Sequence, residues 1–391
     1  MMRKLTYLLL IAFMVASCTS KKAKEKDTDT ANDSIADMGM MYMLLGTYTS
    51  DEGSRGIYVY KIDTDTGESE GVSMVEVANP SYLTLSPDEQ FVYSVGENGE
   101  DDSYAHAFSF DKESGQLKLI DSQLTYGSSP AYITVDAQGY SLITANYGGG
   151  SISQFNITSD GTLSPLSNLY EFEGKGEDPA RQQQPHLHSV RYSPDGSYLF
   201  ATDLGTDKIY RYKTITSVFE GQPALLKNDT LVFKTPAGTG PRHFDFHPNG
   251  LYFYLLGELS GQVIVYDYND GDLQQKQTIL ADTVGAQGSA DIHVSPNGKF
   301  LYASNRLQED GIAIFAIDSE DGTLTKVGYQ LTAKHPRNFA ITPNGKFLLV
   351  AGRDDNVVEV YRIDSKTGLL TNTNQDIAID KPVCIKFAAI N

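Results

Sequence analysis

The sequence predicts an all-β fold, a seven-bladed β-propeller with four antiparallel strands in each blade. The main observation is a unit of short apolar strands, about 45 to 50 residues long, that recurs along the chain at spacings of 46 to 56 residues. This is the size of one propeller blade. The composition agrees, because 40% hydrophobic residues, 35 Gly and 24 Tyr suit a β-rich protein with many tight turns. The chain contains no Trp, which argues against WD40-type repeats.

The repeating unit is clearest in residues 241–269, PRHFDFHPNGLYFYLLGELSGQVIVYDYN. The expected strands are 242–247, 251–257, 262–267 and, more loosely, 275–280. The turn Pro248-Asn249-Gly250 separates the first two strands. Asn-Gly between apolar runs is a strong hairpin signal, because both residues tolerate positive φ.

Five further copies follow the same order, and they begin at Pro80, Pro130, Pro185, Ala290 and Pro336. The seventh copy is split. Residues 382–387 resemble an opening strand with no successor, whereas residues 42–49 and 56–63 resemble the two strands that should follow it. N- and C-terminal strands joined in one blade would close the ring and leave no open sheet edge.

The N-terminal residues predict export. Residues 1–18 carry Arg3 and Lys4, then an apolar core too short to span a bilayer as a helix, then a Val-Ala-Ser-Cys sequence that resembles a lipobox. Cys18 would then be lipidated and become the mature N-terminus. The alternative is an ordinary secretory signal with an accidental Cys. We expect a protein anchored by lipid to a bacterial membrane, on the periplasmic side.

Residues 19–41 are polar and charged, and we expect a disordered tether there. The predicted propeller covers residues 42–391. The only other cysteine is Cys384, so no disulfide is expected once Cys18 is lipidated. The formal net charge of −19 argues against nucleic acid as a partner, although it leaves room for a local basic pocket. We expect a monomer that meets the membrane only through its lipid anchor.

The copies can be aligned on the first residue of the turn between their first two strands, which is Pro248 in the unit above. This alignment gives two comparable sets of positions. Six residues before the turn residue stand Ser81, Ala131, His188, Arg242, Ala290 and Arg337, with Val383 as the seventh. Ten residues after it stand Glu97, Tyr147, Leu204, Glu258, Arg306 and Arg353, with Thr47 as the seventh. The start of one strand and the end of its antiparallel neighbour meet at the same rim. Both sets are therefore expected at one mouth of the central channel.

Charged side chains at this mouth predict an anion-binding site. The converging residues are His188, Arg242, Glu258, Arg306, Arg337 and Arg353. One carboxylate cannot neutralise four guanidiniums, whereas an anionic ligand would. Asn146 and Asn305 could add hydrogen bonds, and Asp203 could orient His188. The alternative is that each is an ordinary solvated loop residue.

Other histidines and metals play no part in this site prediction. His186, His243, His247 and His293 fall out of register, and we expect them to be packing or surface residues. The Pro-His-Leu-His sequence lacks a third ligand, so no metal is expected.

Several motifs resemble those of a known family. They are PHLHSV near residue 185, DLGTDKIYRY near 203, GTGPRHFDFHPNG near 238, the Gly-Glu at 257–258, IHVSPNGKFLYASNR near 292 and PRNFAITPNGKFLLVAG near 336. Residues 42–391 are thereby similar to the seven-bladed propeller lactonases, which include bacterial 6-phosphogluconolactonases and fungal 3-carboxy-cis,cis-muconate lactonising enzymes. The resemblance implies a site formed by His188, Arg242, Arg306 and Glu258, without an essential metal or cofactor.

The implied activity is hydrolysis of an anionic sugar lactone. Glu258 or His188 would be the general base; Glu258 would need a raised pKa for this role. Arg242 and Arg306 would bind the substrate anion or the developing oxyanion, and Arg337 and Arg353 would be outer clamps. Two alternatives stay open, a muconate-type cycloisomerase and a non-catalytic propeller that binds an acidic sugar or a protein.

The export signal departs from the family pattern, because the sugar-phosphate enzymes act on a cytosolic metabolite. This leaves another carboxylated or acidic sugar lactone open as the physiological substrate. The expected partner is therefore a small anionic lactone or a carboxylated sugar.

Overall fold

The computed structural model describes residues 39–99, 102–215 and 225–390. The chain divides into residues 1–36 and a compact unit, residues 37–391, and only the second contains described residues. The predicted signal peptide, Cys18 and nearly all of the tether therefore lie outside the described residues. Within the described ranges, no helix has the length and apolar character needed to cross a membrane.

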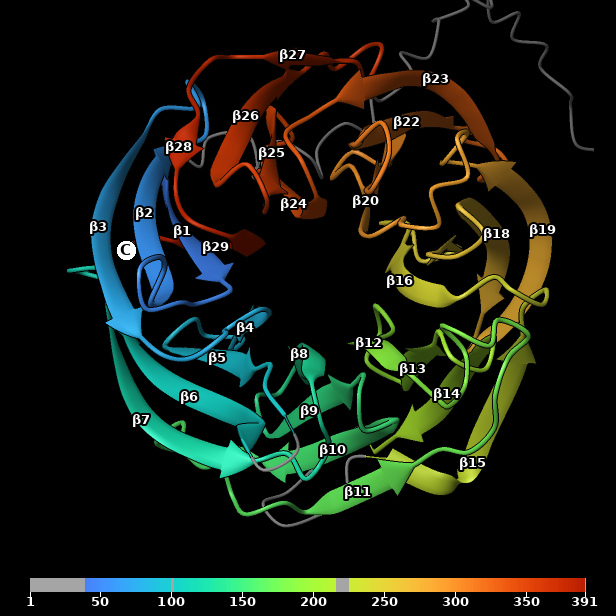
Figure 1. The fold of residues 1–391 in the computed structure, drawn as a ribbon, viewed down its shortest axis with the longest axis horizontal. Helices are drawn as coiled ribbons and strands as arrows, with labels where there is room; N and C mark the ends of the chain where they lie inside the picture. Colours follow the sequence, from blue (N-terminus) through green and yellow to red (C-terminus); the bar gives the residue numbers. More distant parts are fainter. Residues whose placement is uncertain (1–38, 100–101, 216–224, 391) are drawn as a thin grey trace, which may run out of the picture. The chain divides into compact units, whose positions relative to one another are not determined.

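Seven antiparallel sheets surround a common axis, which confirms the predicted propeller (Figure 1). From the innermost strand outwards, the first three blades are β29 (Pro382–Ala389), β1 (Met40–Thr47), β2 (Gly56–Asp63) and β3 (Ser69–Glu76); β4 (Leu83–Leu85), β5 (Phe91–Gly96), β6 (Tyr104–Asp111) and β7 (Gln116–Leu124); and β8 (Pro130–Val135), β9 (Ser141–Asn146), β10 (Ser151–Asn156) and β11 (Asn168–Glu171).

The same order repeats in the other four blades. They are β12 (Leu187–Tyr192), β13 (Tyr198–Asp203), β14 (Lys208–Thr214) and β15 (Leu225–Lys234); β16 (Pro241–Phe246), β17 (Tyr252–Gly257), β18 (Gln262–Asn269) and β19 (Asp272–Leu280); β20 (Ile292–Val294), β21 (Phe300–Asn305), β22 (Gly311–Ile317) and β23 (Leu324–Leu331); and β24 (Pro336–Ile341), β25 (Phe347–Gly352), β26 (Val357–Ile363) and β27 (Leu370–Asn372). In the last blade β28 (Ile377–Ala378) also pairs with β26.

The split blade is confirmed. β1 pairs antiparallel with β29 on one side and with β2 on the other. β29 is also tied to both neighbouring blades, because the Ile385 amide donates to Asn338 Oδ1 (2.8 Å) and the Leu83 amide contacts Cys384 Sγ (3.3 Å). β1 begins at Met40, two residues before the predicted propeller boundary. The ring is thus closed by strands from opposite ends of the sequence.

The Pro-Asn-Gly turn after β16 differs in one detail from the sequence expectation. Gly250 has a φ of +73°, but Asn249 is not among the residues with positive φ. The Gly250 amide donates to the His247 carbonyl, and the Asn249 side chain accepts from the Leu251 amide. Glycine alone therefore supplies the left-handed residue that the hairpin needs.

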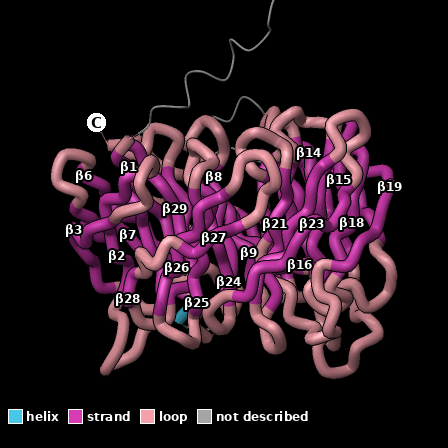
Figure 2. Tube along the Cα trace, turned by 90° about the horizontal axis from the view of Figure 1, so that it is seen from above, coloured by secondary structure: helices cyan, strands magenta, loops and turns pink. Residues whose placement is uncertain are grey.

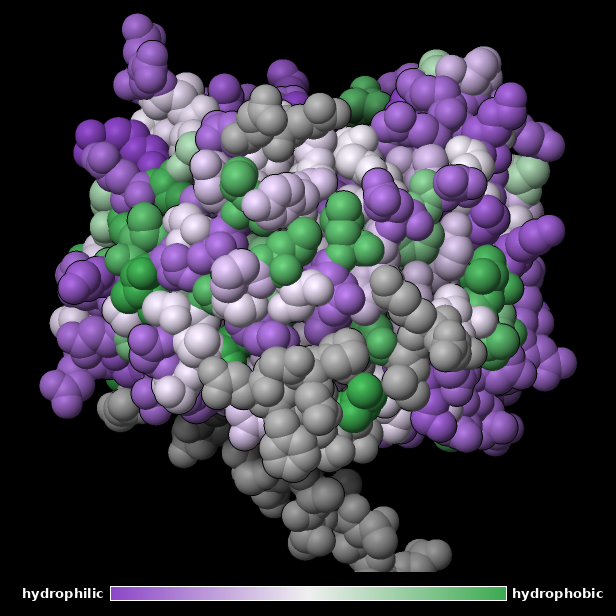
Figure 3. Space-filling view, turned by 90° about the horizontal axis from the view of Figure 1, so that it is seen from below, coloured by the Kyte–Doolittle hydropathy of each residue, from purple (hydrophilic) through white to green (hydrophobic). Residues whose placement is uncertain are grey.

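The apolar core lies between neighbouring blades and not at the axis. One cluster, for example, packs Phe200 of β13 against Phe244 of β16 and Phe253 of β17. Figure 2 shows the strands side-on, with loops gathered at both ends of the sheets. On the face in Figure 3, hydrophilic side chains predominate and apolar ones form small scattered groups, which is normal for a protein surface. The blades are thus held to each other by their faces, and the axis is left to polar residues.

Candidate active site

Five of the innermost strands carry a β-bulge at the rim position that the sequence comparison singled out. The register shifts between Pro130 and Tyr132, Leu187 and Ser189, Pro241 and His243, Pro336 and Asn338, and Pro382 and Cys384. The extra residue is Ala131, His188, Arg242, Arg337 or Val383. A bulge leaves its extra residue unpaired and redirects its side chain. This local geometry places His188 and Arg337 in the lining of a cavity at the mouth of the channel, whereas Arg242 lines only a smaller cavity deeper along the inner strands.

A cavity of about 240 Å³ occupies this mouth. Its lining residues are Glu97, Ala131, Tyr147, Arg181, His188, Glu258, Arg306 and Arg337. A smaller cavity of about 10 Å³ lies deeper along the inner strands and shares Ala131, His188 and Arg337 with the first. We call the larger one the mouth cavity and the smaller one the floor cavity.

Glu258 is the centre of the charged network. It is only 5% exposed, and its carboxylate forms ion pairs with Arg181 (2.6 Å), Arg242 (2.8 Å) and Arg306 (3.4 Å). Burial alone would raise its pKa, but the three guanidiniums outweigh burial and lower the pKa to about 2. A general base needs the opposite shift. The structure thus gives the shift opposite to the one that Glu258 would need as a general base, and the residue is an anion that holds three cations.

The arginines of this network are themselves buried. Arg242 is 1% exposed and also donates to the Ala290 carbonyl. Arg306 donates from Nε to the Gly288 carbonyl (2.8 Å) and contacts His335 Nε2 (3.2 Å). Burial is the main cause that lowers the Arg306 pKa, to about 9, so its guanidinium remains a cation at neutral pH. These contacts fix both side chains before any ligand binds.

Arg353 does not line the mouth cavity. Its guanidinium forms an ion pair with Asp354 (2.6 Å) and contacts His335 Nδ1 (3.2 Å). His335 thus lies between Arg353 and Arg306, and burial together with these two cations lowers its pKa to about 3. Arg353, predicted to be an outer clamp, thus lies outside the lining of both cavities, and Asp354 is the partner of its charge.

His188 is buried between aromatic neighbours. It is 4% exposed, and its ring packs edge-on against Tyr147 (centroids 5.4 Å apart) and His243 (5.1 Å). Burial, followed by Arg242, keeps its pKa well below the usual range. The imidazole is therefore neutral at neutral pH and keeps a free lone pair, while the same lowering of the pKa makes it a weaker base than an ordinary histidine.

Arg337 and Glu97 lie together in the lining of the mouth cavity. Their charged groups lie 3.6 Å apart, and the Arg337 guanidinium stands over the Tyr48 ring, 5.6 Å from its centroid. Glu97 accepts hydrogen bonds from the Tyr48 hydroxyl (2.8 Å) and the Ser81 hydroxyl. Of the residues predicted to be outer clamps, the structure places Arg337 in the lining of both cavities.

Arg181 was missed by sequence reasoning. It lies in the connection between β11 and β12, residues 172–186, outside the repeated register. Gln182 anchors this segment, because its side-chain oxygen accepts from the Glu177 and Asp178 amides (3.1 Å each) and its nitrogen donates to the Leu204 carbonyl (2.9 Å). The length of this connection is the only feature of the sequence that could have drawn attention to Arg181.

Asp203 does not contact His188, contrary to expectation. Its carboxylate accepts from the amides of His186 (2.8 Å) and Gly205 (3.0 Å) and from the Thr206 hydroxyl. It therefore shapes the turn after β13, and its position argues against the role of orienting the histidine.

Asn146 and Asn305 are also absent from the cavity lining. Asn146 donates to the hydroxyls of Ser151 (3.0 Å) and Ser153 (2.8 Å), and Asn305 accepts from the Ser289 hydroxyl (2.6 Å). Successive residues of a strand point to opposite faces, so the residue before a rim position turns into the blade. The hydrogen bonds expected from them to a ligand are therefore not supported by their positions.

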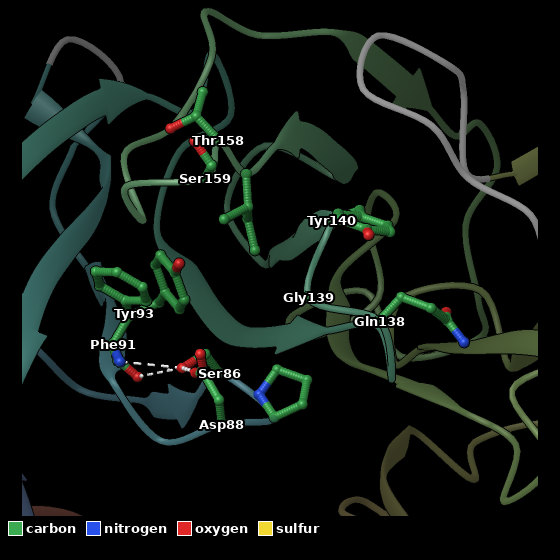
Figure 4. A pocket seen from close by; sticks show the side chains of 11 residues that line it. Ser86, Asp88, Phe91, Tyr93, Gln138, Gly139, Tyr140, Thr158 and Ser159 are labelled. Carbon is green, nitrogen blue, oxygen red and sulfur yellow. Dashed lines mark hydrogen bonds between the residues drawn. The ribbon is translucent and has the colours of Figure 1, made fainter.

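A third cavity, of about 270 Å³, lies at the opposite end of the inner strands, between the hairpin turns of two blades (Figure 4). Phe91, Tyr93 and Tyr140 contribute aromatic surface to it. Among the described residues, Asp88 is the only charged one in its lining, and it is already bonded to the Ser86 hydroxyl (2.6 Å). This lining thus lacks the cationic groups that an anionic ligand requires.

The ring of blades and the lining of the mouth cavity define a seven-bladed propeller with an arginine-lined cavity at one mouth of its channel. Residues 42–387 match the family model described as "Lactonase, 7-bladed beta-propeller". The chain belongs to this family.

Individual relatives agree with this assignment. The chain is similar to a 6-phosphogluconolactonase of Formosa agariphila, with 38% identity over 86% of this chain and 97% of the relative. It is similar in structure to a proposed 6-phosphogluconolactonase of Bacteroides fragilis, with 50% identity, a TM-score of 0.87, and coverage of 93% of this chain and 100% of that chain. A periplasmic gluconolactonase of Pseudomonas aeruginosa, PpgL, gives 34% identity, a TM-score of 0.83, and coverage of 90% and 100%.

Proposed function

We propose that this protein hydrolyses a sugar lactone that carries an anionic group, at the mouth cavity of the propeller. The observation that carries the proposal is a local excess of positive charge. Arg181, Arg242, Arg306 and Arg337 line the two cavities, whereas the carboxylates among the described lining residues are Glu97 and Glu258. This excess of two positive charges lies in a protein whose formal net charge is −19. Such a site favours an anion, and guanidiniums suit carboxylate or phosphate.

His188 is the proposed general base. It is neutral and lines the mouth cavity, whereas the proton-accepting oxygens of Glu258 are held by three guanidiniums. His188 would take a proton from a water molecule as that water attacks the lactone carbonyl. The same proton would then pass to the ring oxygen as the carbon–oxygen bond breaks, so that the ring opens to a single hydroxy acid.

The arginines have two proposed roles. Arg306 lies beside Glu258 and would stabilise the oxyanion that forms when water attacks the carbonyl. Arg337, held over the Tyr48 ring, would bind the anionic group of the substrate. Glu258 would keep the guanidiniums in place without transferring a proton. Because these side chains are fixed before substrate arrives, little ordering is required during the reaction.

Aldonic acid lactones are the substrate class that the relatives favour. The Formosa relative is named a 6-phosphogluconolactonase and the Pseudomonas relative a periplasmic gluconolactonase. The lipobox-like sequence before Cys18 supports an exported, lipid-anchored protein. In that compartment a carboxylated aldonolactone is a candidate alongside the phosphorylated one, and the charge of the cavity suits both.

The test is a comparison of lactones that differ in charge. Proton release would be followed with a pH indicator on 6-phosphogluconolactone, on a hexaric acid monolactone and on neutral gluconolactone, each corrected for spontaneous hydrolysis. We expect kcat/KM to be higher for the anionic lactones. Arg337→Met should raise KM for them roughly ten- to a hundredfold, the value of one charged hydrogen bond, and should leave the neutral lactone nearly unchanged.

Arg362→Met is the matched control, because Arg362 packs over the Phe347 ring and does not line either cavity. Equal kcat/KM for neutral and anionic lactones, together with an equal effect of Arg337→Met on both, would contradict the proposed charge preference. The muconate-type alternative predicts consumption of a muconate, followed by its ultraviolet absorbance. The non-catalytic alternative predicts no turnover of any of these compounds.

A further inference from the structure

A polar cluster lies beneath the mouth cavity, formed by the buried His243, Asp291 and Asn338 and the partly buried His293. His243 Nδ1 lies 2.7 Å from one carboxylate oxygen of Asp291, and His293 Nε2 lies 3.0 Å from the other. The Asn338 amide donates to Asp291 as well. Burial would raise the Asp291 pKa, but the two histidines hold it well below the usual range. Asp291 is therefore an ionised carboxylate deep in the channel.

The bond to Asp291 fixes the tautomer of His243. Burial, with Arg242 next, lowers the His243 pKa to about 3, so the ring is neutral and carries a single proton. A carboxylate only accepts hydrogen bonds, so this proton must be on Nδ1. Nε2 of His243 is therefore left as an acceptor.

Two buried ring nitrogens in this region have no hydrogen-bond partner among the described residues, His243 Nε2 and His188 Nδ1. Their rings are neighbours, with centroids 5.1 Å apart and planes at 67°. Both residues line the floor cavity, whose volume is about 10 Å³. Buried polar atoms are nearly always satisfied, and a cavity of roughly this size holds one water when polar partners surround it.

We propose that one water molecule bridges His188 and His243 in the floor cavity and thereby fixes the tautomer of the catalytic histidine. The water donates to His243 Nε2, which can only accept. Its oxygen then accepts from His188 Nδ1–H. The chain of hydrogen bonds runs from His188 through the water and His243 to Asp291. His243 and Asp291 are positioning residues in this scheme, because neither touches the substrate.

This arrangement leaves the lone pair of His188 on Nε2, the ring nitrogen that remains for the mouth cavity. As Nε2 takes a proton from the attacking water, Nδ1–H stays bonded to the bridging water. The imidazolium charge is then compensated along the chain by the Asp291 carboxylate. The other charged or titratable groups around His188 are Arg242, Arg337 and Tyr147, and the two cations favour the neutral ring between turnovers. The catalytic consequence rests on the function proposed above, whereas the water and the tautomer do not.

The first test reads the tautomer directly. The protein labelled with ¹⁵N-histidine would be studied by long-range ¹H–¹⁵N correlation, with His188 assigned by its loss in His188→Asn. We expect His188 to carry its proton on Nδ1 in the unmodified protein and on Nε2, at least in part, in His243→Phe. The Phe ring preserves the aromatic packing against Tyr82 and Tyr132 but cannot accept a hydrogen bond.

Asp291→Asn is the second variant, because its amide can donate to His243 Nδ1 and reverse the direction of the whole chain. His247→Ala is the matched control, since His247 contacts the Gly298 carbonyl at the far turn. A proton on His188 Nε2 in the unmodified protein, or a tautomer unchanged in folded His243→Phe, would overturn the proposal.

The kinetic arm separates this proposal from the proposed function. His243→Phe should lower kcat roughly 10²- to 10⁴-fold with KM changed less than about threefold, the pattern of a base held in the wrong tautomer. His247→Ala should keep both constants. If the tautomer changes as expected and kcat does not, His188 is not the base and the proposed mechanism fails. If the tautomer does not respond, the water bridge fails whatever the kinetics show.

Discussion

Replacing Glu258 with Gln separates the two roles that a buried carboxylate can have at this site. Gln keeps the shape and can still accept a hydrogen bond, but it removes the charge that three guanidiniums share. If Glu258 is the anion that holds these cations, the variant should lose stability and keep most of its turnover. If Glu258 is the general base, turnover should be lost first.

The magnitude follows from the pKa of Glu258. Its lowering from 4.5 to about 2 corresponds to roughly 3 kcal/mol of folding free energy, at about 1.4 kcal/mol per unit. Because the folded pKa lies below the unfolded one, this stability is present above pH 4.5 and is lost as the pH falls towards 2. The value is an upper bound, since the Arg181 side chain is 36% exposed and water screens its share.

The assay is urea unfolding of both proteins at several pH values between about 3 and 7. We expect Glu258→Gln to be less stable by up to about 3 kcal/mol at neutral pH, and the difference should shrink below pH 4.5. Glu359→Gln is the matched control, because burial raises the Glu359 pKa. In that case the charged form is the less favourable one, so the variant should not lose stability at neutral pH.

Kinetics at neutral pH complete the comparison. With His188 as base, Glu258→Gln should lower kcat less than about tenfold, and KM for an anionic lactone should not rise. If turnover instead falls by about a hundredfold or more while stability is unchanged, Glu258 transfers the proton and the reasoning from its pKa is refuted.

Three other variants test the ring, the anchor and the base. Deletion of residues 382–391 removes β29 and uncovers the inner edge of β1, so we expect insoluble or strongly destabilised protein; a soluble truncation with an unchanged Tm would refute the closure of the ring. Cys18→Ser should move the protein out of the detergent phase in a phase-partition experiment, and unchanged partitioning would contradict the lipid anchor. His188→Asn should lower kcat by about 10²- to 10⁴-fold with KM nearly constant, whereas His247→Ala should leave turnover intact. Equal losses in both would place the site at the wrong end of the channel.

The blade pattern could be predicted from the sequence because each hairpin repeats the same turn chemistry and strand alternation. Even the split blade was predictable, since residues 382–387 formed a strand that lacked a partner. The exact turn conformation was not, because Asn and Gly both tolerate positive φ and only Gly250 adopts it in this turn. Local preferences thus determine which segments pair, and the finer backbone geometry depends on the folded hairpin.

The site was predictable only where it follows the repeat. His188, Arg242 and Arg337 share one register position, and a bulge in each strand aims them at the axis. Arg181 lies in the long connection between β11 and β12, outside the repeated positions, so the register could not reveal it. The low pKa of Glu258 was also beyond the sequence, because it arises from three guanidiniums that are distant along the chain and close in space.

The pairing of β1 with β29 has a consequence for the order in which the protein can be completed during synthesis. Met41 pairs with Ala389. The inner edge of the first described strand can therefore form its hydrogen bonds only after almost the last described residues have been synthesised. A ribosome adds roughly 5 to 20 residues each second, and domains otherwise tend to fold from their N-terminal side as they emerge. Here the blade that contains β1 is necessarily the last to be finished. Because the ring cannot close before the chain is complete, the emerging chain would remain incompletely folded. This suits a polypeptide whose first residues predict passage through a membrane before folding.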